Sequence, residues 1–144
     1  MALHHQLPIY RLAYDLLSMA VEVTRNIPRD FKRLLGEKVR EECVEMLVLI
    51  FRANTARNKV PHIEALQERL QVVELLLRLC RDKRFISTGQ YARAVELTDQ
   101  IGRQSTGWKR ASAASPSRRV WNGPFIGSER SRAGSAVARI RARS

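Results

Sequence analysis

Apolar residues recur at steps of three and four along most of the first 108 residues, which is the period of an amphipathic α-helix. The first such run begins at Pro8, a residue suited to the first turn of a helix, and continues to about Asn26. Its apolar positions are Ile9, Leu12, Ala13, Leu16, Ala20 and Val23. Because Pro28 disfavours helical geometry at Ile27, the pattern predicts a helix over residues 8–26 followed by a turn.

A second and longer periodic run extends from near Phe31 to the residues before Pro61. One stripe of this predicted helix carries Leu35, Val39, Cys43, Met46, Ile50, Ala53 and Arg57. Its charged positions fall mostly on the other side, at Glu37, Arg40, Glu41, Glu45 and Arg52. The run also holds a group of carboxylates, Glu41, Glu42 and Glu45. They alternate with Lys38 and Arg40 at pairing distance, so we interpret them as a solvated face.

Pro61 fits the first turn of a third helix, which is predicted to stop at Asp82-Lys83-Arg84. Its apolar stripe is Ile63, Leu66, Leu70, Val73, Leu77 and Cys80. Ser87, followed three residues later by Gln90, forms a capping-box pattern that predicts the start of a fourth helix. This helix is expected to run to about Trp108, with Tyr91, Ala94, Val95, Thr98, Ile101 and Ser105 on its stripe.

The connections between the four predicted helices are only a few residues long, so consecutive helices should be antiparallel neighbours. The expected fold is all-α, an up-down-up-down antiparallel four-helix bundle over residues 1–108. Only 7 Gly, 5 Pro and 6% aromatic residues are present, which favours helices over a sandwich or barrel. Residues 109–144 are rich in Ser, Ala, Gly and Arg, and this composition favours a flexible basic tail over an ordered element.

The apolar stripe of the second predicted helix is broad, because Val44, Leu47, Val48 and Phe51 flank its main line. Apolar surface that remains after a bundle closes commonly marks a subunit interface. We therefore expect a homo-oligomer.

The two cysteines, Cys43 and Cys80, both lie in Leu- and Val-rich helical stretches. They are predicted to be small core residues, not a disulfide or half of a metal site, which fits a reducing cytoplasm. The N-terminus lacks the pattern of a secretory signal, and the chain has no run of about 18 apolar residues. We expect a cytoplasmic protein that does not interact with a membrane.

Charge is the strongest functional signal in the chain. The sequence has 26 Lys and Arg against 14 Asp and Glu, a net charge of +12, which attracts polyanions. Residues 1–108 carry 17 basic and 13 acidic side chains, whereas residues 109–144 carry 9 and 1. Most of the excess therefore lies in the last quarter of the chain.

An antiparallel bundle would also collect basic residues at its two ends. One end should gather Arg25, Arg29, Lys32, Arg33, Lys38, Arg78, Arg81, Lys83, Arg84 and Arg93. The opposite end should hold Arg11, Arg52, Arg57, Lys59, Arg103, Lys109 and Arg110, with the basic tail leaving from it.

These basic residues have two interpretations. Cations near helix C-termini complement the helix dipole, which accounts for Lys83 and Arg84 and extends to Lys59. The dipole disfavours cations at helix N-termini, so Lys32 and Arg33 are better explained by phosphate contact. We favour a surface that faces a polyanion over ordinary solvated charge.

The spacing Arg57-Asn58-x-x-x-His62 resembles the signature of the helical HEPN ribonucleases, in which a His serves as acid or base and an Arg stabilises the phosphate. A short motif of this kind is weak in an Arg-rich chain, and Pro61 separates the two groups. We favour an exposed His62 in the first turn of the third helix. His4 and His5 lack a nearby third metal ligand, and no phosphate-binding or nucleophile motif occurs, so neither a cofactor nor enzymatic activity is expected.

Five segments resemble a known family of four-helix proteins. They are LPIYRLAYDLL (7–17), IPRDFKRLLGEKVREE (27–42), FRANTARNK (51–59), LLLRLCRD (75–82) and YARAVELTDQIGRQSTGW (91–108). Their order and loop lengths are similar to those of the accessory variability determinant of diversity-generating retroelements. The wider family includes proteins encoded in intervening sequences of large ribosomal RNA genes. Residues 109–144 have no counterpart in the family pattern.

The resemblance implies a non-catalytic protein that forms a homopentamer of four-helix protomers. Such a protein binds the retroelement's reverse transcriptase and RNA or DNA, and it supports adenine-mutagenic copying of a template repeat. Carried over by position, Arg78 in LLLRLCRD, with Arg81 and Arg84 beside it, is the main candidate contact. The full set of expected contacts is Arg78, Arg81, Arg84, Lys83, Arg25, Arg29, Lys32, Arg33, Arg57, Lys59, Lys109 and Arg110.

Two alternatives keep the same helices but change the function. A protein of the ribosomal intervening-sequence type would have another partner. A HEPN-like ribonuclease would cleave RNA and lose that activity on substitution of His62.

Overall fold

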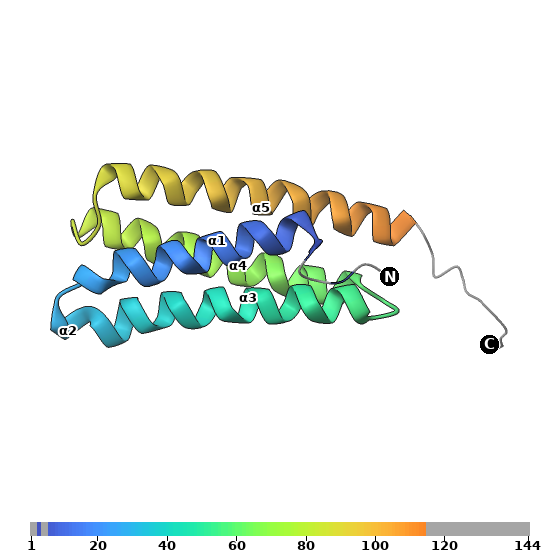
Figure 1. The fold of residues 1–144 in the computed structure, drawn as a ribbon, viewed down its shortest axis with the longest axis horizontal. Helices are drawn as coiled ribbons and strands as arrows, with labels where there is room; N and C mark the ends of the chain where they lie inside the picture. Colours follow the sequence, from blue (N-terminus) through green and yellow to red (C-terminus); the bar gives the residue numbers. More distant parts are fainter. Residues whose placement is uncertain (1–2, 4–5, 115–144) are drawn as a thin grey trace, which may run out of the picture. The chain divides into compact units, whose positions relative to one another are not determined.

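The structure, a computed structural model, describes residue 3 and residues 6–114. All regular structure in these residues is helical, which confirms the predicted all-α class. The four long helices are α1 (Pro8–Val23), α3 (Lys38–Thr55), α4 (Val60–Asp82) and α5 (Thr88–Ala114). They lie side by side, and each runs in the direction opposite to the one before it (Figure 1).

The helix α1 begins at Pro8 and buries Ile9, Ala13 and Leu16 on one stripe, as its sequence period requires. A 3-10 turn, η2 (Thr24–Asn26), completes the segment predicted to be helical to about Asn26. The chain then turns through Ile27, which is buried and extended.

The second predicted helix starts earlier and is less regular than the pattern indicated. A single turn, α2 (Arg29–Phe31), leads into a six-residue π-helix, η3 (Lys32–Glu37), and then without a break into α3. Within η3, Gly36 is buried next to η2, and an added Cβ would lie 3.5 Å from the Cβ of Thr24. The Arg40 guanidinium donates a hydrogen bond to the Thr24 hydroxyl at 2.8 Å, which holds the start of α3 against the end of α1.

The capping box predicted for the fourth helix is confirmed. The backbone N–H of Gln90 donates to the Ser87 hydroxyl at 3.0 Å, and the backbone N–H of Ser87 donates to the Gln90 side-chain oxygen at 2.9 Å. The helix continues to Ala114 and does not stop near Trp108 as predicted. The rest of the predicted basic tail lies outside the described residues.

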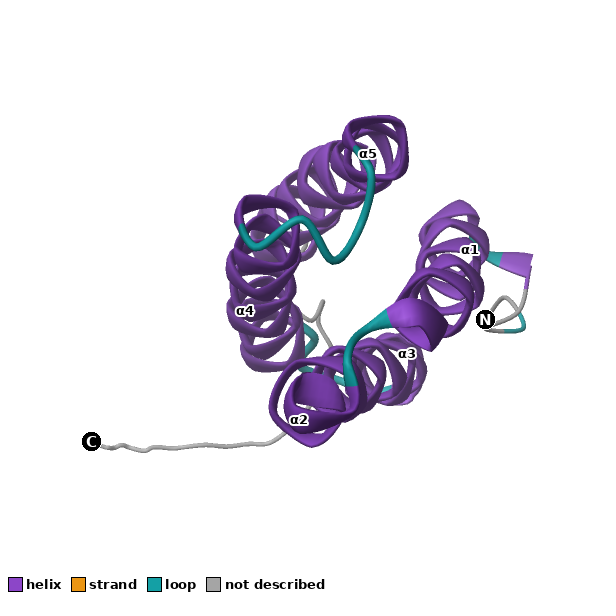
Figure 2. Ribbon diagram, turned by 90° about the vertical axis from the view of Figure 1, so that its left-hand side faces the viewer, coloured by secondary structure: helices purple, strands orange, loops and turns teal. Residues whose placement is uncertain are grey.

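One core runs along the inner faces of the long helices, and α3 packs against both α1 and α4 (Figure 2). Cys43 and Cys80 are both buried free thiols, as predicted. Burial, with a smaller contribution from the neighbouring Glu42 carboxylate, raises the pKa of Cys43 to about 12, and burial also raises the pKa of Cys80. None of the described helices is both long and apolar enough to span a membrane.

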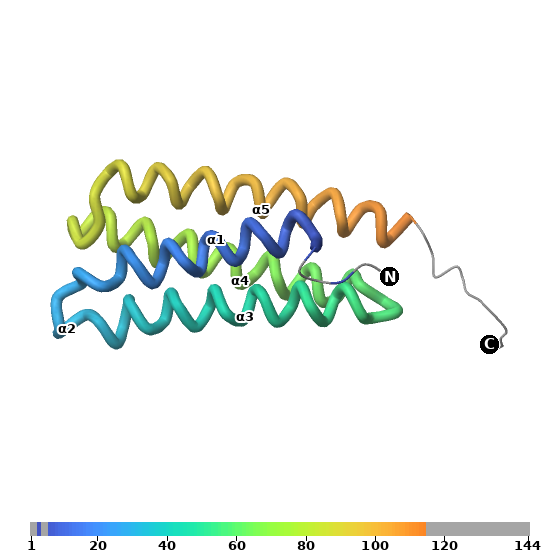
Figure 3. The backbone as a smooth tube through the Cα atoms, in the orientation of Figure 1, coloured from blue at the N-terminus to red at the C-terminus, as the bar shows by residue number. Residues whose placement is uncertain are grey.

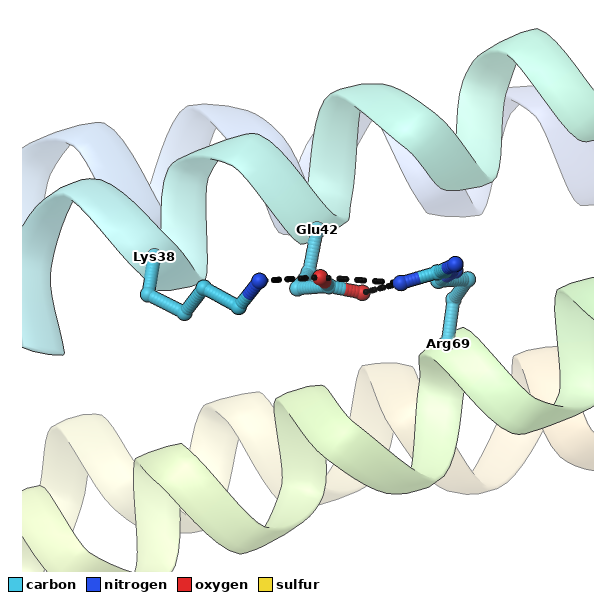
Figure 4. Close-up of polar contacts among 3 residues, drawn as sticks. All are labelled: Lys38, Glu42 and Arg69. Atoms are coloured by element: carbon cyan, nitrogen blue, oxygen red, sulfur yellow. Dashed lines mark hydrogen bonds and ion pairs between the residues drawn. The ribbon is translucent and has the colours of Figure 1, made fainter.

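Glu42 corrects the prediction of a solvated carboxylate face. Its side chain is only 4% exposed and lies between α3 and α4. It pairs with Lys38 on its own helix at 3.1 Å and with Arg69 on α4 at 3.1 Å (Figure 4). Position 42 follows Val39 by three residues and precedes Met46 by four, so it belongs to the inward stripe.

Candidate nucleic-acid interface

Two chain segments that are distant in sequence meet at one end of the bundle. The first is the turn from α1 into α2 and η3, and the second is the end of α4 with the loop to α5 (Figure 3). The rings of Phe31 and Phe85 join them, with their centroids 5.1 Å apart. We call residues 25–33 and 78–84 the basic end.

The basic end carries a large excess of positive charge. Its two segments contain two acidic residues, Asp30 and Asp82. Its eight basic residues are Arg25, Arg29, Lys32, Arg33, Arg78, Arg81, Lys83 and Arg84. All of these except the half-buried Arg81 are exposed, and all eight were predicted as contacts from the sequence.

Only one of the eight basic side chains forms an ion pair with another described residue. Arg81 contacts Asp82 at 2.7 Å, and its guanidinium lies 4.6 Å from the centroid of the Tyr91 ring. The hydrogen bonds that the Arg81 guanidinium donates to the Asp82 carboxylate raise the pKa of Arg81. Within the described part of the chain, the other seven side chains have no carboxylate partner, so they are available to phosphate groups.

The backbone of Arg84 adopts a conformation that arginine disfavours. Its φ is +63°, in the left-handed region where glycine is preferred. Two hydrogen bonds close the end of α4 around it: the N–H of Phe85 donates to the carbonyl of Cys80 at 2.8 Å, and the N–H of Arg84 donates to the carbonyl of Arg81 at 2.9 Å. This is a Schellman motif, in which glycine normally occupies the position held by Arg84.

Several basic side chains also lie at a helix N-terminus, where the helix dipole disfavours positive charge. Arg29 is the first residue of the continuous helical segment formed by α2, η3 and α3, and Lys32 and Arg33 follow within about one turn. Positive charge at a helix N-terminus is unfavourable by about 0.3 to 1 kcal/mol per residue. Dipole complementarity therefore does not explain this side of the basic end.

The opposite end offers fewer unpaired cations. The Lys59 ammonium donates to the carbonyls of Ala53, Asn54 and Ala56, each at 3.0 Å, and so caps the C-terminus of α3. Partial burial lowers the pKa of Lys59. Lys59 is therefore engaged at the C-terminus of α3, which agrees with its alternative interpretation as a cation that complements the helix dipole.

The other predicted contacts at the opposite end differ in their surroundings. Lys109 pairs with Glu64 on α4 at 3.1 Å. Arg57 is exposed in the bend between α3 and α4, not on the apolar stripe to which the helical period assigned it, because α3 ends at Thr55. Arg110 is exposed in α5. The structure thus does not join these residues to the eight of the basic end.

The sequence resembling a ribonuclease motif spans a break between two helices. Arg57 and Asn58 are exposed in the bend, whereas His62 is half-buried in the first turn of α4, so its predicted exposure is only partial. In the described part of the chain, no group of three or more His, Cys, Asp or Glu side chains is placed to hold a metal ion.

Comparison with known proteins identifies the family. The model of the bAvd-like family matches residues 7–112, which is more than half of the chain. No curated protein matches the sequence. The match covers α1, α3, α4, the whole of the basic end and α5 as far as residue 112, and it confirms the resemblance seen in the sequence. The chain belongs to the bAvd-like family.

Proposed function

We propose that this protein is a non-catalytic accessory protein of a diversity-generating retroelement, and that it binds RNA or DNA together with the reverse transcriptase. Family membership supports the accessory role, because Avd-type proteins are generally accessory and non-catalytic. The observation that supports nucleic-acid binding is the convergence at the basic end of seven exposed cations that have no carboxylate partner among residues 6–114. In this role the protein supports mutagenic copying of a template repeat.

Electrostatic attraction to phosphate groups should contribute most of the binding free energy at the basic end. Each phosphate neutralised by Lys or Arg releases condensed counterions, so affinity falls steeply with salt. If about six phosphates are contacted, the logarithm of the binding constant falls with a slope of roughly −4 on single strands and −5 on duplexes against the logarithm of the salt concentration. Because these contacts are to the backbone, little sequence selectivity is expected.

The test compares two triple variants with the same loss of charge. One is Lys32→Ala/Arg33→Ala/Arg84→Ala at the basic end, and the other is the exposed set Arg11→Ala/Arg52→Ala/Arg103→Ala. Fluorescence anisotropy with labelled RNA and DNA over a series of salt concentrations gives both affinity and slope. The first variant should lose roughly three units of salt slope, about one for each cation, and the second should keep the parent slope.

Two outcomes would contradict the proposal. If the parent protein shows no salt-dependent binding to RNA or DNA, the basic end does not serve nucleic acid. If the two triple variants lose affinity equally, net charge alone accounts for the binding, and no particular end is responsible.

The reverse transcriptase and further copies of this chain are the proposed protein partners. Val44 and Phe51 on α3 are 47% and 46% exposed, so part of the broad apolar stripe lies outside the core. We propose that this surface supports a homo-oligomer, with the pentamer implied by the family resemblance as the expected state. Light scattering on the parent protein and on Val44→Lys measures the mass. Co-purification with the reverse transcriptase tests the second partner, and nucleic-acid binding without that association would indicate a different partner protein.

A further inference from the structure

The basic end contains an exposed aromatic ring between its cations. Phe31 is 40% exposed although its ring contacts Phe85. In the sequence it lies two residues after Arg29 and directly before Lys32 and Arg33. An isolated exposed Phe needs no explanation, but an exposed ring flanked by three cations without carboxylate partners combines two kinds of contact at one position.

We propose that the nucleic acid bound at the basic end is single-stranded, and that one of its bases stacks on Phe31. This inference rests on the proposed nucleic-acid function and names the substrate form. Proteins that bind single strands combine cations that follow the backbone with aromatic rings that stack on unpaired bases. Bases in a duplex are stacked inside the helix, so they do not offer a free face to a side chain without being extruded.

The other aromatic residues near Phe31 have less room for a base. Phe85 is half-buried, and its ring is tilted by 39° to that of Phe31, so it supports the exposed ring from one side. Tyr91 is also half-buried, and the Arg81 guanidinium lies over its ring. Leu34, at 67% exposed, adds apolar surface three residues after Phe31. Phe31 is therefore the position at this end with an aromatic face available for stacking.

The experiment measures the affinity of full-length protein for a labelled oligo(dT) and an oligo(U) of about 16 nucleotides, and for a duplex of the same length. Phe31→Leu removes the ring but keeps an apolar side chain against Phe85. Tyr14→Leu is the control, because it also replaces an exposed ring by leucine, but on α1 and away from the basic end. Phe31→Trp tests rescue by a larger ring. Thermal melting of each variant verifies that the bundle is folded.

We expect Phe31→Leu to weaken single-strand binding about tenfold, with its salt slope and its duplex affinity unchanged, because no charge is removed. Tyr14→Leu should match the parent, and Phe31→Trp should bind single strands at least as tightly as the parent. These results together would support stacking on Phe31.

Three results would overturn the inference, and each has a different meaning. If Phe31→Leu binds single strands like the parent while the Lys32/Arg33/Arg84 triple variant still loses binding, stacking is wrong and the proposed function stands. If the parent binds neither form, the proposed function itself fails. If Phe31→Leu loses association with the reverse transcriptase and keeps its single-strand affinity, the exposed ring belongs to a protein contact.

Discussion

The buried carboxylate of Glu42 allows a prediction about which member of a charged cluster matters most for stability. Glu42 accepts hydrogen bonds from the Arg69 guanidinium at 3.2 and 3.1 Å and pairs with Lys38 at 3.1 Å (Figure 4). Its side chain is 4% exposed, whereas those of Lys38 and Arg69 are 48% and 45% exposed. Lys38 and Arg69 remain half exposed to water, whereas the Glu42 carboxylate does not. Removing Glu42 therefore leaves half-exposed cations without their partner, whereas removing a cation leaves a buried carboxylate.

The magnitudes follow from that difference in exposure. At 3.1 Å and an effective dielectric constant of about 20, each pair attracts by roughly 5 kcal/mol before solvation is counted. Solvent screening of the half-exposed cations reduces this attraction, and burying the carboxylate costs several kcal/mol. Replacing Glu42 by Met should therefore change the free energy of unfolding by only about 0 to 1 kcal/mol. Replacing Arg69 by Met leaves a buried carboxylate with only Lys38 and should cost about 2 to 3 kcal/mol.

Urea unfolding followed by circular dichroism measures these differences. The double variant Glu42→Met/Arg69→Met should be close to Glu42→Met alone, because no carboxylate is left without its partner. Arg103→Met is the control: it breaks an exposed pair with Asp99 and should cost less than about 0.5 kcal/mol. If Glu42→Met is destabilised as much as Arg69→Met, the argument from unequal exposure is refuted.

Three further predictions concern the left-handed arginine and the buried thiols. Arg84→Gly should raise the free energy of unfolding by about 0.5 to 1 kcal/mol, because glycine adopts positive φ freely. The same variant should reduce the salt slope of nucleic-acid binding by about one, because a cation is lost. A destabilised variant would contradict the argument that Arg84 is strained. Cys43 and Cys80 should remain unreactive toward iodoacetamide at about pH 8.5 until the protein is unfolded. Burial raises the pKa of Cys43 from 9.0 to about 12, so at rising pH the thiol ionises first in the unfolded chain. The free energy of unfolding should therefore fall as the pH rises from about 9 to about 12, and it should fall less in Cys43→Ala.

Hydrophobic periodicity predicted the helices because each helix buries one stripe of apolar side chains. Pro8 and the Ser87–Gln90 pair defined helix starts through local chemistry, which is why those boundaries agree with the structure. The π-helix escaped prediction because nothing in the local pattern of residues 32–37 distinguishes it from an α-helix. The end of α5 was placed too early because residues 109–114 lack an apolar stripe, although their alanines favour helix.

The sequence predicted which basic residues make up the candidate site but not the contacts that these segments form. Antiparallel helices with short connections are sufficient to bring the basic segments 25–33 and 78–84 together. The contact between Phe31 and Phe85 was not foreseen, because nothing in either local pattern points to a ring so distant in the sequence. The sequence indicated that Lys59 complements the dipole at a helix C-terminus. Its hydrogen bonds to the carbonyls of α3 were not foreseen, since they depend on how the chain bends after Thr55.

Charge at the basic end is arranged at a cost to folding. Arg84 occupies a left-handed position, which is unfavourable by about 1 kcal/mol, and cations in the first turn after Pro28 oppose the helix dipole by about 0.3 to 1 kcal/mol each. Together these amount to roughly 2 kcal/mol, a substantial part of the 5 to 15 kcal/mol that typically separates folded from unfolded states. Among the described residues, the only ion pair at this end is that of Arg81 with Asp82, and the helix dipole favours only the cations near the C-terminus of α4, so no ion pair offsets the cost at the start of α2. Stability alone would favour glycine at position 84 and fewer cations after Pro28, and under the proposed function the phosphates of a bound polyanion would neutralise the same cations.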